Sequence, residues 1–108
     1  MNNFSCIIIG NTGVTISCAE LLLQKKCNIL SIISNDIKVK KWAAENFIKC
    51  FNSIEDIVWD IEFDYLFSIA NPIIIPRWLI EKPNKLAINY HDSLLPKYAG
   101  TNATSWAI

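Results

Sequence analysis

The chain has 108 residues, which is enough for one small domain with a single modest core. Hydrophobic residues make up 52% of the sequence, a proportion that favours a folded protein over a disordered one. The 10 basic and 10 acidic residues leave a formal net charge of +0, so nothing in the overall charge draws the protein to nucleic acid or to an anionic membrane.

Apolar runs of strand length alternate with helical patterns along the chain. The runs predict strands at residues 4–9, 28–34, 48–51, 64–70 and 86–91. Apolar spacing and start signals predict helices at residues 14–26 and 36–46, a capped turn at 53–56, a helix from Pro76 and a last helix from Thr101 or Asn102. Strands that alternate with helices predict an α/β fold, a Rossmann-like parallel sheet with flanking helices and right-handed crossovers.

The turn after the first predicted strand contains Gly10 and Gly13 directly before a helix. Such a turn can hold a phosphate at the helix N-terminus, and Asp36 lies at a distance along the chain typical of a ribose-binding acid. The full G-x-G-x-x-G pattern is absent, because Thr12 and Thr15 interrupt it. We therefore favour a tight turn that needs small residues, with nucleotide binding as the alternative. Asp36, or its neighbour Asn35, also suits the N-cap of the second helix.

The four cysteines have wide, uneven spacing and no C-x-x-C pattern, which argues against a metal site. Cys6 falls inside an apolar strand and Cys18 inside a helix, so we predict buried thiols in a reducing compartment, the cytoplasm. The amino-terminal segment has neither a basic flank nor a long uninterrupted apolar run. Neither a signal peptide nor a membrane span is predicted.

An asparagine and the chain's single histidine lie at the end of the fifth predicted strand, as Asn89 and His91. Side chains two residues apart on a strand point to the same face. The carboxyl ends of strands are where α/β sheets place their ligand sites. An amide donor beside a histidine suits attack on a carbonyl, where negative charge develops on oxygen and a proton must move.

The segment around this pair resembles the formyltransferase family that uses 10-formyltetrahydrofolate. The family signature reads Asn-x-His, then Ser-Leu-Leu-Pro and aromatic-x-Gly, and it is met by Asn89, His91, Ser93, Leu94, Leu95, Pro96, Tyr98 and Gly100. The amino-acid sequence at Tyr90, Asp92 and residues 98–106 is most similar to that of formyltransferase-like domains attached to peptide synthetases. The resemblance implies the N-terminal domain type of that family, a folate donor, an amine acceptor, and attached or adjacent peptide-synthetase modules as possible partners.

The resemblance also implies roles for particular residues. Asn89 and His91 would be two of three catalytic residues, and the third, an aspartate, is expected beyond Ile108. The apolar, proline-bracketed segment 70–76 would be the pterin-binding loop, with the donor held at Asn71, Pro72, Ile73 and Ile75. Many relatives carry Tyr-Gly in place of Asn71-Pro72, and core packing is the alternative role of this loop. Asp92 is expected to serve the loop or the substrate side, and no metal is implied.

Other function classes stay open. One is a non-catalytic folate- or nucleotide-binding fragment; another is a formyltetrahydrofolate hydrolase, in which water replaces the amine. The chain ends at Ile108 shortly after the start of a predicted helix that still carries Trp106. We therefore expect residues 1–108 to be the N-terminal part of a longer catalytic domain, incomplete at its C-terminus.

Overall fold

A computed structural model describes residues 3–91 of the chain. Strands and helices alternate from the first element to the last, as the sequence predicts. In order, the elements are β1 (Ser5–Gly10), α1 (Gly13–Gln24), β2 (Asn28–Ile33), α2 (Ile37–Glu45), β3 (Lys49–Phe51), the 3₁₀ turn η1 (Ile54–Asp56), β4 (Tyr65–Ile69), α3 (Arg77–Ile80) and β5 (Leu86–Tyr90).

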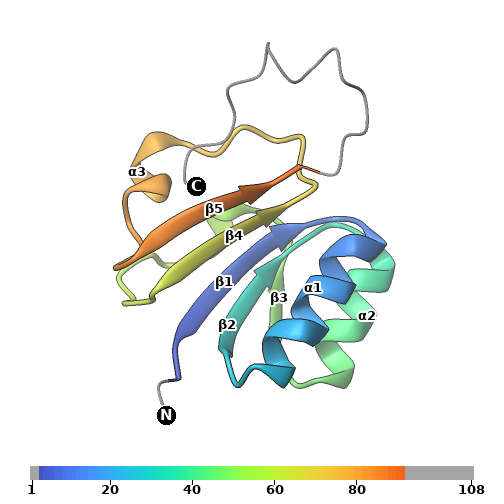
Figure 1. The fold of residues 1–108 in the computed structure, drawn as a ribbon. Coiled ribbons are helices and arrows are strands. Elements are labelled where there is room, and N and C mark those ends of the chain that lie inside the picture. The colour runs from blue at the N-terminus through green and yellow to red at the C-terminus, as the bar shows by residue number, and fades with distance from the viewer. Residues whose placement is uncertain (1–2, 92–108) are drawn as a thin grey trace.

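The five strands form one sheet in the order β3-β2-β1-β4-β5, and every pairing is parallel. Figure 1 shows the consequence: the chain first winds outward from β1 through β2 to β3, then returns to add β4 and β5 on the other side. The predicted parallel α/β fold is therefore confirmed. The order reverses between β1 and β4, and such a switch point opens a crevice at the carboxyl ends of the strands.

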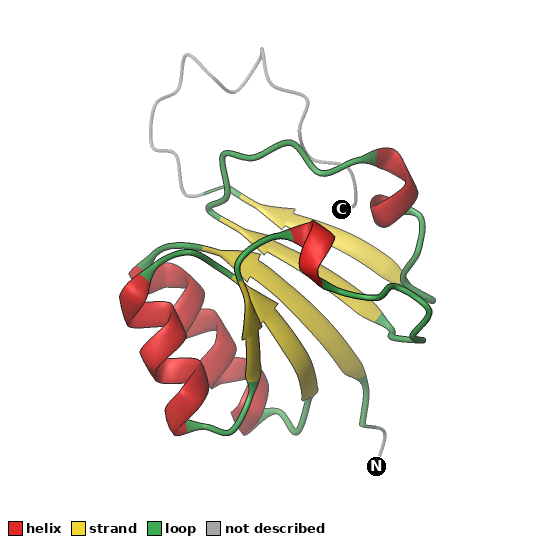
Figure 2. Cartoon of the chain, turned by 180° about the vertical axis from the view of Figure 1, so that it is seen from behind, coloured by secondary structure: helices red, strands yellow, loops and turns green. Residues whose placement is uncertain are grey.

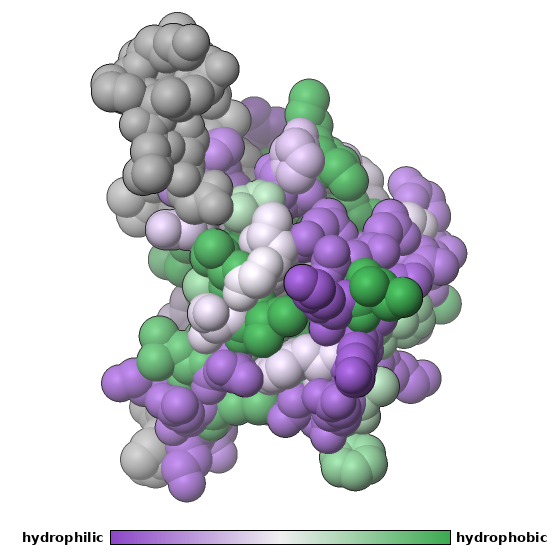
Figure 3. Space-filling model, turned by 90° about the vertical axis from the view of Figure 1, so that its right-hand side faces the viewer, coloured by the Kyte–Doolittle hydropathy of each residue, from purple (hydrophilic) through white to green (hydrophobic). Residues whose placement is uncertain are grey.

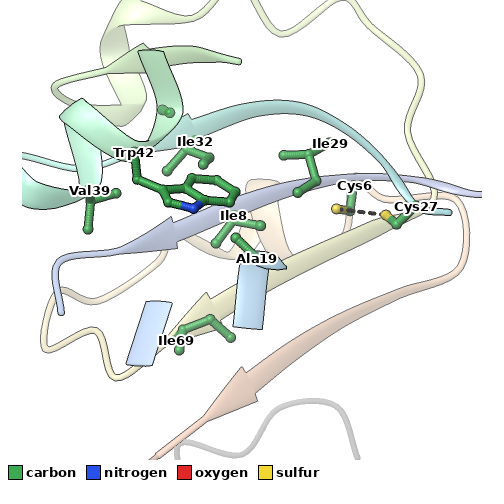
Figure 4. Close-up of a cluster of buried hydrophobic side chains, with 10 residues drawn as sticks. Cys6, Ile8, Ala19, Cys27, Ile29, Ile32, Val39, Trp42 and Ile69 are labelled. Atoms are coloured by element: carbon green, nitrogen blue, oxygen red, sulfur yellow. Dashed lines mark hydrogen bonds between the residues drawn. The ribbon is translucent and has the colours of Figure 1, made fainter. Parts of the chain in front are cut away.

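The sheet separates two apolar clusters. Helices α1 and α2 cover one face, where Ile8 of β1 and Ile32 of β2 pack against Ala19, Val39 and Trp42 (Figure 4). The other face is covered by η1, the segment that follows it, and α3, as the view from behind shows (Figure 2). Its core is made by the alternate strand residues and their neighbours: Ile7, Ile9, Ile33, Phe63, Leu66, Ile75, Leu79 and Ala87.

The outer side of the α1–α2 layer faces solvent. Figure 3 shows this side as mainly hydrophilic, with separate apolar side chains among polar ones. Leu21 of α1 and Ile37 of α2 are exposed. Such scattered apolar residues are normal on a protein surface. Among residues 3–91, no helix is long and apolar enough to cross a membrane.

Several local signals in the sequence act as predicted. The Asp36 side chain caps α2 by accepting hydrogen bonds from the backbone N–H groups of Lys38 and Val39, both at 3.0 Å. Ser53 and Asp56 form a capping box, although it opens a 3₁₀ turn rather than an α-helix. Pro76 is the N-cap of α3 instead of its first residue, and this helix ends after four residues. The last predicted helix lies outside the described residues.

The predicted burial of the thiols is confirmed for Cys6. It lies in β1 with its Sγ atom 3.1 Å from that of Cys27, which is also buried (Figure 4). Burial raises the pKa of both thiols above its ordinary value, because the thiolate would lose its hydration. Cys18 in α1 is half-buried. All four cysteines are free, and residues 3–91 contain no group of three or more potential metal ligands.

Phe47 offers a test of the backbone after α2. It follows the C-cap Asn46 with φ of 58°, in the left-handed region that favours glycine, and its side chain is 96% exposed. Phe47→Gly is expected to raise the free energy of unfolding by about 1 kcal/mol, because relief of backbone strain outweighs the extra entropy of the unfolded chain. Phe47→Ala, which keeps the strain, serves as the control in urea denaturation. Equal stability of the two variants would contradict the prediction.

Candidate functional site

Two loops leave the carboxyl edge of the sheet at its switch point. The first follows β1 and contains Asn11; the second follows β4 and runs from Ala70 to Pro76. Ala70 has φ of 46°, an unusual value for a residue with a side chain, and its N–H donates to the carbonyl of Tyr90 at 2.8 Å. The left-handed residue turns the chain out of the sheet directly beside the end of β5.

The second loop is held by the side chain of Asn71, which is buried. Its Nδ2 donates to Ser68 Oγ and to the carbonyl of Ile73, and its Oδ1 accepts from the Ile73 N–H, each at 3.2 Å. The last of these is an Asx turn, which an Asn-Pro pair favours. Asn71 was predicted from the resemblance as a donor-binding residue, and the structure gives its side chain a scaffolding role that the sequence interpretation missed, although the Asn-Pro signal was visible.

The isoleucines of this loop differ in exposure. Ile73 is 55% exposed and Ile74 is 89% exposed, whereas Ile75 is 5% exposed and packs with Leu66 and Leu79 in the second core cluster. Core packing, the alternative role of the loop, therefore holds for Ile75. Ile73 and the exposed Pro72 remain on the surface of the loop, where a ligand can reach them.

Asn89 lies in β5 opposite Ser68 of β4, which in turn lies opposite Ile9 of β1. This row of strand residues lies on the face of the sheet that carries the second core cluster, and the Ser68 hydroxyl accepts a hydrogen bond from the Asn71 side chain. His91 follows β5 immediately and is exposed. Neither residue is on a helix. Asn89 lies within β5, whereas His91 is the first residue past its end, so their shared face stays a prediction. Each takes part in interactions with the rest of the protein.

The loop after β1 is shaped by close packing. A Cβ atom on Gly10 would lie 2.2 Å from Thr15 Oγ1 and 2.8 Å from the carbonyl oxygen of Ile69, whereas one on Gly13 would meet nothing within 4 Å. The expectation of a tight segment that needs a small residue is thus confirmed for Gly10. In this arrangement Thr15 fills the space behind the loop, and Asp36 uses its carboxylate to cap α2.

A pocket of about 210 Å³ lies between the first loop, the ends of β2 and β3, and the second loop. Its apolar wall contains Ile9, Ile33 and Ile54, and residues 73–76 close one side. The polar part is formed by Asn11, Ser34, Asn35, Asn52, Ser53 and Glu55. The sequence interpretation missed this pocket, because its residues come from four separate segments.

Part of the predicted site falls outside the described residues. This holds for Asp92, for the segment from Ser93 to Gly100 that carries the rest of the sequence signature, and for the expected third catalytic residue beyond Ile108. The catalytic and donor-binding roles of Asn89, His91, Asn71, Pro72, Ile73 and Ile75 therefore stay predictions.

The chain is an α/β domain with a doubly wound parallel sheet, and polar residues and a hydrogen-bonded loop lie at its switch point, the place where such sheets bind ligands. The chain belongs to the formyl transferase family, whose model matches residues 24–108. The family resemblance read from the sequence is thereby confirmed.

Two curated relatives of the chain are methionyl-tRNA formyltransferases. The chain is 25% identical over 121 residues to that of Clostridioides difficile (strain 630), a match that covers 94% of the chain and 39% of the relative. It is 31% identical over 111 residues to that of Mycoplasmopsis pulmonis (strain UAB CTIP), covering 87% of the chain and 38% of the relative. The chain thus spans about 39% of the length of the first of these relatives.

Proposed function

We propose that the protein transfers a formyl group from 10-formyltetrahydrofolate to an amine. Membership of the formyl transferase family supports the class of reaction. The observation that carries the proposal is the position of Asn89 near the carboxyl end of β5. It lies opposite Ser68 of β4, whose hydroxyl accepts a hydrogen bond from Asn71, the anchor of the loop. A donor held by this loop would have its reactive group within reach of Asn89 and His91.

The proposed chemistry needs two groups at the formyl carbon. The unprotonated amine attacks this carbon, the bond from the carbon to N10 of the folate breaks, the amine loses a proton and N10 gains one. Asn89 donates a hydrogen bond to the formyl oxygen, where negative charge develops, and one such donor is worth about 10²–10³ in rate. His91 stabilises the same oxygen and helps to move the proton. The expected downstream aspartate orients His91.

The acceptor is proposed only as an amine. The relatives from C. difficile and M. pulmonis act, by name, on methionyl-tRNA. The sequence similarity to peptide-synthetase domains favours an amine on an attached or adjacent module instead. Transfer of an isotope-labelled formyl group by the natural protein to methionyl-tRNA, compared with transfer to a small amine, tests the reaction. No labelled product with any amine would refute the proposed function.

Ile73→Asp tests the proposed donor loop. The substitution places a carboxylate beside the expected apolar ring site, and burial of this unpaired charge under the ligand is costly. Affinity for 5-formyltetrahydrofolate, a stable folate, is expected to fall at least tenfold, about 1.4 kcal/mol, in a calorimetric titration. Leu21→Asp, which changes an exposed apolar residue near the C-terminal end of α1 and outside the pocket lining, is the control and should bind like the unmodified protein. Unchanged affinity of the Ile73 variant would remove the loop from the donor site.

A further inference from the structure

Two thiols lie next to each other at the amino edge of the sheet. Cys6 is the second residue of β1, and Cys27 directly precedes β2. Their Sγ atoms are 3.1 Å apart, and the two side chains point toward each other (Figure 4). A disulfide bond is ~2.05 Å long, so a shift of about 0.5 Å by each sulfur would bring the pair to bonding distance.

Backbone hydrogen bonds hold the two cysteines at this separation. The N–H of Asn28 donates to the carbonyl of Phe4 at 2.7 Å, which ties the start of β2 to the residue before β1. The N–H of Cys27 donates to the carbonyl of Leu22 in α1 at 2.9 Å. The fold therefore brings together two thiols that lie 21 positions apart along the chain.

The other two cysteines do not share this arrangement. Cys18 lies on α1 and Cys50 on β3, and among residues 3–91 neither sulfur has another sulfur within hydrogen-bonding distance. The Cys50 Sγ atom lies instead 4.0 Å from the carbonyl oxygen of Ser34. A bond between two thiols of the folded chain is therefore expected to be selective for Cys6 and Cys27.

Access from solvent differs between the two thiols. Cys6 is fully buried in β1, a central strand, whereas Cys27 follows Lys25 and Lys26, two exposed residues of the turn after α1. Lys26 has φ of 69°, in the left-handed region, so the turn is strained. Exposed turns open more readily than central strands, and opening of this turn uncovers Cys27 first. Burial raises the pKa of both thiols, so the reactive thiolate is scarce while the turn is closed.

We propose that Cys6 and Cys27 are a site of reversible oxidation to an intramolecular disulfide, with hydrogen peroxide as the oxidant. The thiolate of Cys27 attacks one peroxide oxygen and the O–O bond breaks, which gives a sulfenic acid and one water. Cys6, as its thiolate, then attacks the Cys27 sulfur; the S–S bond forms, the S–O bond breaks and a second water leaves. The two thiols together lose two electrons and two protons, and the peroxide takes up both.

The disulfide would lie away from the proposed catalytic pair. It would join β1 to the start of β2 at the amino edge of the sheet, whereas Asn89 lies near the carboxyl end of β5. All five strands are parallel, so these are opposite edges. Peroxide is close to water in size, which suits a sulfur reached only by local opening. The inference stands on the paired thiols and does not depend on formyl transfer.

Peptide mapping provides the test. The natural protein is incubated with a molar excess of hydrogen peroxide, its remaining thiols are blocked with iodoacetamide, and it is digested with trypsin without reductant. Because Cys18 shares a tryptic peptide with Cys6, the Cys18→Ser variant is mapped in parallel. In this variant the expected product joins residues 1–25 to residues 27–38, and dithiothreitol separates the two peptides.

A disulfide that fits the folded chain should also raise stability. The bond restricts the unfolded chain, so the urea midpoint of the oxidised protein is expected to exceed that of the reduced protein by about 1 M. Cys50→Ser removes a thiol outside the pair and should leave both the linked product and this shift unchanged. A link to Cys50, sulfinic acid at Cys27 without a link, no linked product, or a midpoint that fails to rise would each overturn the proposal.

Discussion

Gly10→Ala is expected to lower the free energy of unfolding by about 3 kcal/mol, at the upper end of the usual cost of overpacking. The added Cβ would lie 2.2 Å from Thr15 Oγ1 and 2.8 Å from the Ile69 carbonyl oxygen. Thr15 is fully buried in α1 and the carbonyl belongs to β4, so neither neighbour can move away without shifting an element. Urea denaturation monitored by circular dichroism measures the loss.

Gly13→Ala is the matched control for this prediction. Gly13 is the first residue of α1, is exposed, and leaves open space around an added Cβ. The same substitution there should change stability by less than about 1 kcal/mol, in the stabilising direction, because alanine has the higher helix propensity. Similar effects at both positions would show that the packing of Gly10 against Thr15 is not what restricts the loop. A second variant, Gly10→Ala with Thr15→Ser, should recover part of the stability.

The contrast between these glycines also shows how far sequence reasoning reaches. The turn Gly10–Gly13 was visible as a turn, and a preference for small residues was predicted. The requirement for a small residue falls on Gly10 because of its contacts with Thr15 and Ile69. Thr15 lies on the next helix, and Ile69 lies on a strand far along the chain. Hydrophobic periodicity shows which residues share a face of one helix or strand. It does not show which residues from distant segments of the chain will contact that face.

The strands were predictable for a related reason. Strands of a parallel sheet are covered on both faces, so runs such as residues 5–10 and 28–33 are almost continuously apolar. This composition alone identifies them as strands. The short helix α3 was harder to bound, because its end depends on Lys82-Pro83 and on docking of Leu79 into the core. At the candidate site, Asn89 and His91 were found through their pattern and spacing. The scaffold of Asn71 and Ser68 and the polar pocket required the assembled sheet.

His91→Ala is expected to lower turnover by at least 10² in the natural protein, with little change in affinity for 5-formyltetrahydrofolate. The reason is that His91 is proposed to act on charge that appears mainly in the transition state, so its loss affects the rate and not the binding of the donor. Asn89→Ala should lower turnover by about 10²–10³ through loss of an oxyanion donor. The measurement is steady-state formyl transfer combined with a folate titration.

The conservative variants separate chemistry from folding. Asn89→Asp keeps the size of the side chain but replaces the N–H donor, so the rate should stay low even where the protein folds normally. Lys85→Ala is the matched control and should retain full turnover. Lys85 is exposed and directly precedes β5, at the end of the strand away from Asn89. Because Asn89 lies beside Ser68, folding of each variant is checked by its urea midpoint. Full activity of a folded His91→Ala variant would exclude His91 from the chemistry, whereas a lost rate with unchanged donor affinity and stability is the result that a catalytic role requires.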